Sequence, residues 1–248
     1  MTATNVLVRV QAKGGKFLGP DAGYSQVTLT DAATGTVLAT GIAEGGSGTL
    51  TGGFVAAATR QQIVSAMWGT QVTLWLSATP GQATAGLTAA LDLDAPTLVQ
   101  FTAEALTDGT PNGHTVTQTM WLTPGADLTA EPGVVLVMPG LMVKDVAATV
   151  ATDPGSLNVS AFVAMMCGCK IDPSLPWQPS EFVVTAVVTD STGTIVGQAP
   201  LTCTGMSSFA TAQPITPTGP GPFTVTVTAV QAAEGNIGSA TTTYSVPG

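Results

Sequence analysis

Short runs of alternating apolar and polar residues recur along almost the whole chain. In the run from Asn5 to Ala12, Val6, Val8 and Val10 occupy every second position and so share one face of an extended strand. Similar runs follow at short intervals, with Gly, Pro and Asp residues between them. Short strands with regular turn signals predict an all-β protein, since parallel-sheet folds need helices between their strands.

The other predicted strands share this alternation. They lie within residues 25–41, 71–78, 86–93, 97–105, 114–122, 133–146, 158–171, 181–206, 221–230 and 237–246. Gly35 supplies the left-handed residue of a hairpin turn inside the first of these runs. A helical spacing of apolar residues occurs only at 56–69, which is the single helix candidate, with an irregular loop as the alternative.

A Pro-Gly turn in "TVATDPGSL" predicts a linker, and we expect two domains, residues 1–150 and 151–248. The segments "TDAATGTVL" (residues 30–38) and "TDSTGTIV" (residues 189–196) share a Thr-Asp opening and a Thr-Gly-Thr turn. This echo suggests that the two domains are related modules.

The C-terminal run "GPFTVTVTAVQAAEGNIGSATTTYSV" resembles the last two strands of bacterial immunoglobulin-like and fibronectin-like modules. The likeness is carried by Gly235-Asn236 and by the Ser-Ala-Thr run at residues 239–241. It implies a fold class of two immunoglobulin-like antiparallel β-sandwich domains. Such modules serve adhesins, enzyme accessory domains and metal carriers, so the resemblance implies a fold and leaves the function open.

Composition narrows the set of partners. The chain has 248 residues, 44% of them hydrophobic, which is enough to fill a core, and only 8% charged. The 15 acidic residues against 6 basic ones leave no basic stripe for a phosphate backbone, so we expect no nucleic acid partner. No run of about 18 apolar residues is present, which predicts no membrane span.

The first residues lack the basic and apolar regions of a signal peptide. We therefore expect a cytoplasmic protein, or an exported one if a leader precedes this sequence. Exposed sheet edges would allow the chain to form a homo-oligomer or to bind a protein partner by strand addition. The segment "GGSG" (residues 45–48) lacks a following helix, so no nucleotide or organic cofactor is indicated, and the sequence names no small-molecule substrate.

The chemically distinctive segment is "AMMCGCK", which places Met165, Met166, Cys167 and Cys169 within five residues. Read as an extended strand, it puts Met165, Cys167 and Cys169 on one face, within reach of a single soft metal ion. The same extended backbone holds the two cysteine β-carbons too far apart for a relaxed disulfide, so none is predicted.

Other sulfur residues could complete such a site. Cys203 and Met206 in "LTCTGM" lie on a different predicted strand that a sandwich can bring alongside, and Met138 and Met142 are further candidates. We expect a copper, nickel or cobalt ion, with metal carriage and metal catalysis both open. Zinc is disfavoured, because structural zinc sites usually draw on paired Cys-x₂-Cys motifs.

Over three residues, Cys-Gly-Cys looks like the nickel ligand of acetyl-CoA synthases and is similar to the Cys-Ser-Cys claw of nitrile hydratases. It also resembles the Cys-x-Cys copper motif of immunoglobulin-like copper chaperones for cytochrome oxidase. Each likeness implies a metal ligand set built on Cys167 and Cys169.

Two alternatives remain open. In the first, the chain is a structural or adhesive immunoglobulin-like module whose cysteines are buried and inert, since Cys and Met are common core residues. In the second, Cys167 or Cys169 is an enzyme's nucleophile. A nucleophilic thiolate needs a neighbouring cation or imidazole, and the sequence offers Lys170 and the single histidine, His114.

Overall fold

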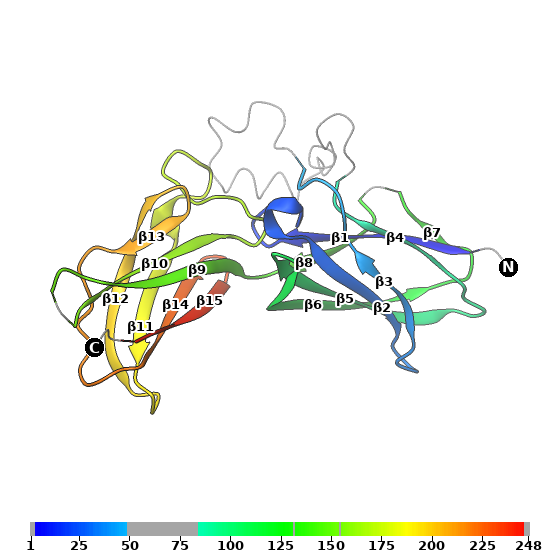
Figure 1. Ribbon diagram of the computed structural model, residues 1–248. Helices are drawn as coiled ribbons and strands as arrows, with labels where there is room; N and C mark the ends of the chain where they lie inside the picture. Colours follow the sequence, from blue (N-terminus) through cyan, green and yellow to red (C-terminus); the bar gives the residue numbers. More distant parts are fainter. Residues whose placement is uncertain (1–2, 49–83, 131, 154, 246–248) are drawn as a thin grey trace. The chain divides into compact units, whose positions relative to one another are not determined.

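The structure is a computed structural model that describes residues 3–48, 84–130, 132–153 and 155–245 (Figure 1). Within these residues the regular structure is β, apart from two single 3₁₀ turns, η1 (Pro20–Ala22) and η3 (Pro179–Glu181). The predicted all-β class is thus confirmed. The helix candidate at 56–69 and the predicted strand at 71–78 lie outside the described residues.

The chain divides into two compact units. The first contains residues 1–139 together with 166–169, and the second contains residues 140–165 and 170–248. This boundary falls before the predicted division near Ala151, because the next strand pairs within the second unit. The segment "TVATDPGSL", predicted as a linker, connects two strands of one hairpin, in which Leu157 pairs with Val150.

The first unit holds two β-sheets (Figure 1). In one, β4 and β1 are antiparallel, and β1 also pairs in parallel with β7 and with β8. The other is antiparallel in the order β3-β2-β5-β6. The strands are β1 (Thr4–Ala12), β2 (Ser25–Asp31), β3 (Val37–Ile42), β4 (Leu87–Leu91), β5 (Thr97–Thr107), β6 (Thr110–Leu122), β7 (Asp127–Leu128) and β8 (Val134–Met138).

The core of the first unit follows the period of two that the sequence predicts. Val6, Val8 and Val10 are all buried on one face of β1, which confirms the predicted face. Buried alternate residues of the other strands complete this core, namely Val27, Leu29, Leu91, Val99, Phe101, Ala103, Leu136 and Met138. Each sheet therefore has one buried face, which is the arrangement of a β-sandwich.

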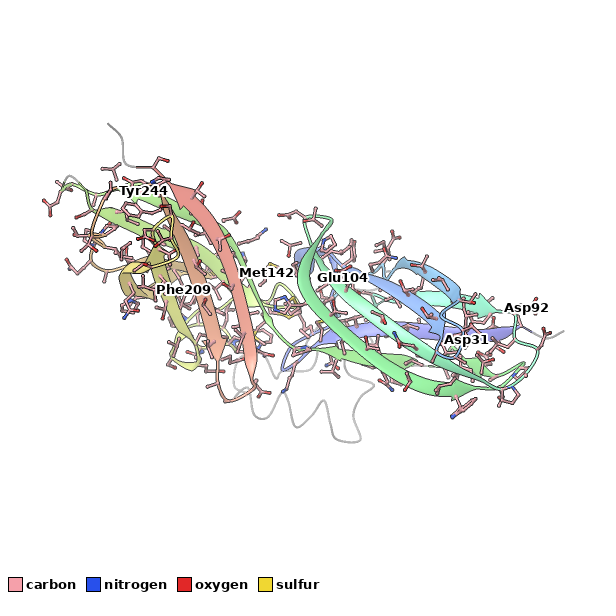
Figure 2. The ribbon with its side chains drawn as sticks, turned by 90° about the horizontal axis from the view of Figure 1, so that it is seen from below. Asp31, Asp92, Glu104, Met142, Phe209 and Tyr244 are labelled. Carbon is pink, nitrogen blue, oxygen red and sulfur yellow. A yellow bond between two sulfur atoms is a disulfide. The ribbon has the colours of Figure 1, made fainter. Side chains whose placement is uncertain are left out.

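The second unit has one continuous antiparallel path in the order β15-β14-β11-β12-β13-β10-β9. Its strands are β9 (Leu141–Val150), β10 (Leu157–Met165), β11 (Val183–Thr189), β12 (Ile195–Gly205), β13 (Ser208–Thr211), β14 (Phe223–Gln231) and β15 (Asn236–Tyr244). Buried side chains from β9, β13 and β15, including Met142, Phe209 and Tyr244, lie in its core (Figure 2).

The two ends of this path, β9 and β15, come together around a buried amide. Asn236 is fully buried, accepts a hydrogen bond from the backbone N–H of Gly140 at 3.0 Å and donates one to Gln231 Oε1 at 2.8 Å. Next to it, a β-carbon on Gly238 would lie 2.1 Å from the carbonyl oxygen of Leu141. Glycine is thus required for this close approach, which folds the path back on itself to enclose a core.

Six consecutive strands of each unit follow the same plan. The sheet β3-β2-β5-β6 has the same antiparallel order as β12-β11-β14-β15, and β4 pairs with β1 as β13 pairs with β10. The units differ in two respects: β12 also pairs with β13 in the second unit, which joins its strands into one path, and the neighbour on the other side of β1 and β10 differs. In the first unit this place is taken by β8, parallel to β1, and in the second by β9, antiparallel to β10.

The sequence echo falls on equivalent turns of this plan. Asp31 opens the β2–β3 turn, where its carboxylate accepts hydrogen bonds from the N–H groups of Ala33 and Thr34 (Figure 2). Asp190 opens the β11–β12 turn and accepts from the N–H groups of Thr192 and Thr194. Gly35 has a φ of +74°, as the hairpin prediction requires. These local bonds favour the turn over alternative conformations.

The same bonds predict an acid-dependent loss of stability. The N–H of Ala33 lowers the pKa of Asp31 most strongly, and the hydroxyl of Thr192 does so for Asp190. A lowered folded-state pKa contributes stability above the unfolded value of about 3.9, and that stability is lost as the pH falls through the folded value. We expect the variant Asp31→Asn/Asp190→Asn to show a flatter fall of the unfolding free energy below pH ~4.

Urea unfolding of both proteins at a series of pH values measures this difference. The neutral amides keep the acceptor oxygen of each turn, so the comparison isolates the titration. Equal slopes for the parent and the variant would show that these carboxylates titrate alike in the folded and unfolded chains.

Candidate functional site

The Cys-Gly-Cys segment lies in a loop after β10. The strand ends at Met165, and residues 166–169 turn away from it before Lys170 bridges back to Ala164. Gly168 has a φ of +76°, a conformation that suits glycine and breaks the extended backbone. The predicted strand through Cys169 is therefore wrong in its last residues.

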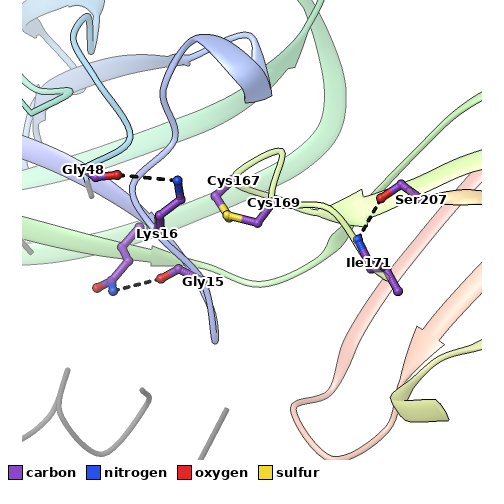
Figure 3. The surroundings of a disulfide bond; sticks show 8 residues. Gly15, Lys16, Gly48, Cys167, Cys169, Ile171 and Ser207 are labelled. Atoms are coloured by element: carbon purple, nitrogen blue, oxygen red, sulfur yellow. Dashed lines mark hydrogen bonds between the residues drawn. A yellow bond between two sulfur atoms is a disulfide. The ribbon is translucent and has the colours of Figure 1, made fainter. Parts of the chain in front are cut away.

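The loop is closed by a disulfide bond between Cys167 and Cys169 (Figure 3). The prediction that these cysteines form no disulfide is also wrong. It assumed an extended backbone, whereas the turn at Gly168 brings the two Cα atoms to 5.3 Å, within the usual range for a disulfide. Cys167 is 1% exposed and Cys169 is 8% exposed, so the bond is shielded from solvent.

The loop packs against the turn that follows β1 in the first unit (Figure 3). A β-carbon on Gly15 would lie 3.0 Å from Cys167 Sγ, so glycine there leaves room for the sulfur. A β-carbon on Gly168 would lie 2.5 Å from the backbone oxygen of Asp21, in η1. The backbone at Gly168 therefore packs against the backbone of Asp21 on one side of the loop, and the Cys167 sulfur packs against Gly15 on the other.

Met166, in the loop, lies close to the polar side chain of Asn112, which in turn contacts His114. The Asn112 side chain donates from Nδ2 to Met166 Sδ at 3.5 Å, and its Oδ1 is 3.2 Å from His114 Nδ1. Met166 is 1% exposed. The lone histidine thus belongs to the same neighbourhood as the loop, with Asn112 between the imidazole and the Met166 thioether.

A lysine lies on the turn that packs against the loop. Burial lowers the pKa of Lys16, and the carboxylate of Asp21 acts in the opposite direction. Its Nζ donates to the carbonyl oxygen of Gly48 at 3.5 Å (Figure 3).

The second-rank sulfur residues lie on the second unit. Cys203, on β12, is half-buried and a free thiol, with Sγ 4.0 Å from the carbonyl oxygen of Ile171. Met206 is 53% exposed in the β12–β13 turn, where its N–H donates to Asp172 Oδ2 at 2.9 Å. Both residues therefore contact Ile171 and Asp172 of the second unit.

The two methionines before the cysteines differ in their positions. Met165 is fully buried as the last residue of β10, where it pairs with Leu141, whereas Met166 belongs to the loop. Met138 and Met142 are buried core residues of β8 and β9. The described part of the chain contains no group of three or more His, Cys, Asp and Glu side chains placed to hold a metal ion.

Three residues of this site escaped sequence reasoning, namely Gly15, Asp21 and Asn112. Each contacts the loop from far away in sequence, and only the fold brings it there. The one signal that could have drawn attention is the pair Gly14-Gly15 in the turn after β1, since glycine often marks a close approach.

The chain matches no protein-family model and no curated protein. Among solved structures it is similar to the T6 backbone pilin of serotype M6 Streptococcus pyogenes, described as a modular three-domain structure. The identity is 11% and the TM-score 0.25, over 99% of this chain and 64% of the pilin chain. Values this low say nothing about function. No helix in the described ranges has the length and apolar character needed to cross a bilayer.

The close contact at Gly168 predicts that this residue anchors the loop. A Gly168→Ala substitution puts a β-carbon against the Asp21 backbone at a φ of +76°, whereas Gly109→Ala, at +79°, meets open space in the same unit. In both variants, alanine in the left-handed backbone conformation costs about 1–2 kcal/mol of unfolding free energy. We expect Gly168→Ala to lose a further ~1–3 kcal/mol of unfolding free energy from overpacking.

Chemical denaturation of the two variants, with hydrogen exchange of β1 and β5 to report on the first unit, measures the difference. Equal losses for Gly168→Ala and Gly109→Ala would mean that the loop does not pack on η1 in solution.

Proposed function

We propose that this protein is a structural module of two tandem immunoglobulin-like sandwiches, in which the cysteine pair stabilises a loop and performs no chemistry. The observation that carries the proposal is the buried Cys167–Cys169 disulfide seated against Gly15. A catalytic or metal-binding thiolate needs a free, accessible sulfur. Here both sulfurs are joined to each other and shielded from solvent.

The strand order of the second unit supports the immunoglobulin-like assignment. Its path contains β9-β10-β13 as three neighbours and β12-β11-β14-β15 as four. With the strands lettered in chain order, these are A-B-E and C′-C-F-G, which resembles the two sheets of immunoglobulin-like and fibronectin-like sandwiches. The first unit supports the same plan, since β1 to β6 are arranged as β10 to β15.

The outer surface of the sheets suits a scaffold. In the first unit, Thr40, Thr28, Thr102 and Thr117 form one row across β3, β2, β5 and β6. Their hydroxyls pair across strands, with 3.1 Å between Thr28 and Thr40 and 3.3 Å between Thr102 and Thr117. Such cross-strand hydroxyl pairs stabilise a solvent-facing sheet without charges, in keeping with the 8% charged residues of the chain.

The disulfide also bears on location. Disulfides persist in oxidising compartments and are rare in reducing cytosol. The proposal therefore favours the exported alternative over the cytoplasmic one. The ring closed by this bond contains a single intervening residue, so it constrains the unfolded chain less than a longer loop would. Its contribution is to hold the loop conformation that fits between Gly15 and Asp21.

A thiol count separates the structural proposal from its rivals. Of the three cysteines, only Cys203 is free. Protein denatured without reductant should therefore titrate one thiol with an aromatic disulfide reagent, and protein that is denatured, reduced and then freed of reductant should titrate three. The Cys203→Ser variant should titrate none before reduction. Three thiols in the unreduced parent protein would sink the proposal.

Soft-metal binding is the second candidate, and it applies to the reduced pair. The observation in its favour is that two sulfurs lie on residues whose Cα atoms are 5.3 Å apart, close enough for one ion to bind both. The proposed ligands remain Cys167 and Cys169, with Met166 beside them in the loop. In this reading a copper, nickel or cobalt ion would replace the disulfide after reduction.

Elemental analysis tests this candidate. Protein reduced and reconstituted without oxygen is compared with a Cys167→Ser/Cys169→Ser variant by plasma mass spectrometry. One equivalent of metal in the parent and none in the variant would favour metal carriage. Equal, sub-stoichiometric metal in both would leave the structural module as the better account.

The cysteine-nucleophile alternative has less support. Lys170 is exposed, and His114 is hydrogen-bonded to Asn112. A nucleophilic sulfur would have to be released from the disulfide and exposed before either residue could activate it.

A further inference from the structure

The chain passes through the first unit in a way that determines how it would respond to tension. It enters at the start of β1, near Thr4, and first leaves at the end of β8, at Met138, before the short loop of residues 166–169 returns to it. β1 and β8 are neighbours and run parallel. The points of entrance and exit therefore lie at opposite ends of two adjacent strands, and a force between them pulls these strands past each other along their length.

The contact between these strands is continuous. Five residue pairs join them in register, namely Val8–Val134, Arg9–Val135, Val10–Leu136, Gln11–Val137 and Ala12–Met138. A backbone hydrogen bond of 2.8 Å from the N–H of Lys13 to the carbonyl of Met138 extends the ladder beyond β1. Earlier along β1, the short strand β7 pairs in parallel through Asn5–Asp127 and Val6–Leu128.

We propose that the β1–β8 pair is a mechanical clamp that lets this protein bear load along its chain. The inference rests on the proposed structural role, since only a module inside a tensioned assembly needs it. Force applied from end to end loads all the β1–β8 bonds together, so they must break together. The same bonds pulled from one end would open one after another, each at a lower force.

Side-chain packing opposes sliding of β8 as well. Leu136 and Met138 are fully buried, and a slip of one residue would turn them to the opposite face of the sheet. At the start of the strand, Gly133 has a φ of +74°, and a β-carbon there would lie 2.4 Å from the carbonyl oxygen of Leu7. The backbone of β8 is thus pressed against β1 where the ladder begins.

The first unit differs from the second in the strand that pairs with β1 on this side. In the shared plan, the place beside β1 corresponds to the place of β9 beside β10, which is antiparallel. In a hairpin, the two free chain ends lie at the same end of the strand pair, so a force between them would open the bonds one after another. The first unit instead fills the place beside β1 with its last strand, in parallel, so that the strand bearing the exit of the chain pairs with the strand bearing its entrance.

Pulling the same molecule in two directions tests the clamp. Handles are attached to the full chain at Ala3 and Pro139 in one protein, and at Ala3 and Pro124 in the other. All three residues are exposed, and both prolines are replaced by the same azide-bearing residue. The first pair shears β1 against β8, while the second pulls β1 and β7, the short parallel strand before β8, apart from the same end. Optical tweezers then record the unfolding force of the first unit.

We expect a severalfold higher unfolding force for the Ala3/Pro139 pair at equal loading rate and equal melting temperature. Forced unfolding reports the unfolding barrier rather than the equilibrium stability, so the two directions can differ in one protein. Equal forces in both directions would overturn the clamp. They would leave the structural proposal standing, because that proposal is decided by the thiol count.

A second measurement leaves both prolines in place. Handles at Ala3 and at Ala147, an exposed residue of β9, load β1 and β8 in the shear direction, and Gly133→Ala should then lower the unfolding force of the first unit. Gly109→Ala, which meets open space at a similar φ, is the matched control. A force unchanged by Gly133→Ala, or lowered equally by both substitutions, would contradict the clamp.

Discussion

Alternation of buried and exposed side chains along hydrogen-bonded strands is the constraint on which the rest of this structure depends. Because a strand turns successive side chains to opposite faces, each sheet that buries its Val, Ala and Leu residues must present the residues between them to solvent. In this protein many of the intervening residues are Thr. The register of each ladder is therefore held by the core, and the threonine rows on the outer faces follow from it.

The same plan is used twice, and the two units differ most in the strand that lies beside β1 or β10. Six strands of each unit correspond, and the place beside β1 or β10 is filled either by the unit's last strand or by its first. β8 and β9 are consecutive in the chain, separated only by Pro139 and Gly140. Proline removes a donor and Gly140 has a φ of +128°, so the extended run is interrupted where it passes from one ladder to the other.

Most strands could be predicted because their signal is local. The valines of β1, the hairpin at Gly35 and the turn at Asp190 each depend on a few neighbouring residues, and the structure confirms them. The expected linker at "TVATDPGSL" and the expected strand through Cys169 were wrong, because each rested on a local signal that occurs in two structures. A Pro-Gly turn occurs in linkers and in hairpins, and a Gly between two cysteines occurs within a bulged strand and at the end of a strand.

The candidate site was predictable only in its own short segment. The sequence pointed to Cys167 and Cys169, but the bond between them depends on the turn at Gly168. The residues that surround the loop lie more than fifty positions away, on the β1 turn, η1 and β6. Contacts over such separations are set by the pairing of whole strands, and a single sequence does not reveal which strands pair.

One consequence concerns any attempt to study the units apart. Residues 166–169 belong by their contacts to the first unit, although the sequence around them belongs to the second. A fragment ending at Pro139 would lack the loop that packs on Gly15 and Asp21, and a fragment starting at Ala151 would lack β9. Neither unit is thus a contiguous gene segment, so deletion or domain transplantation at a single cut would expose core that the intact chain covers.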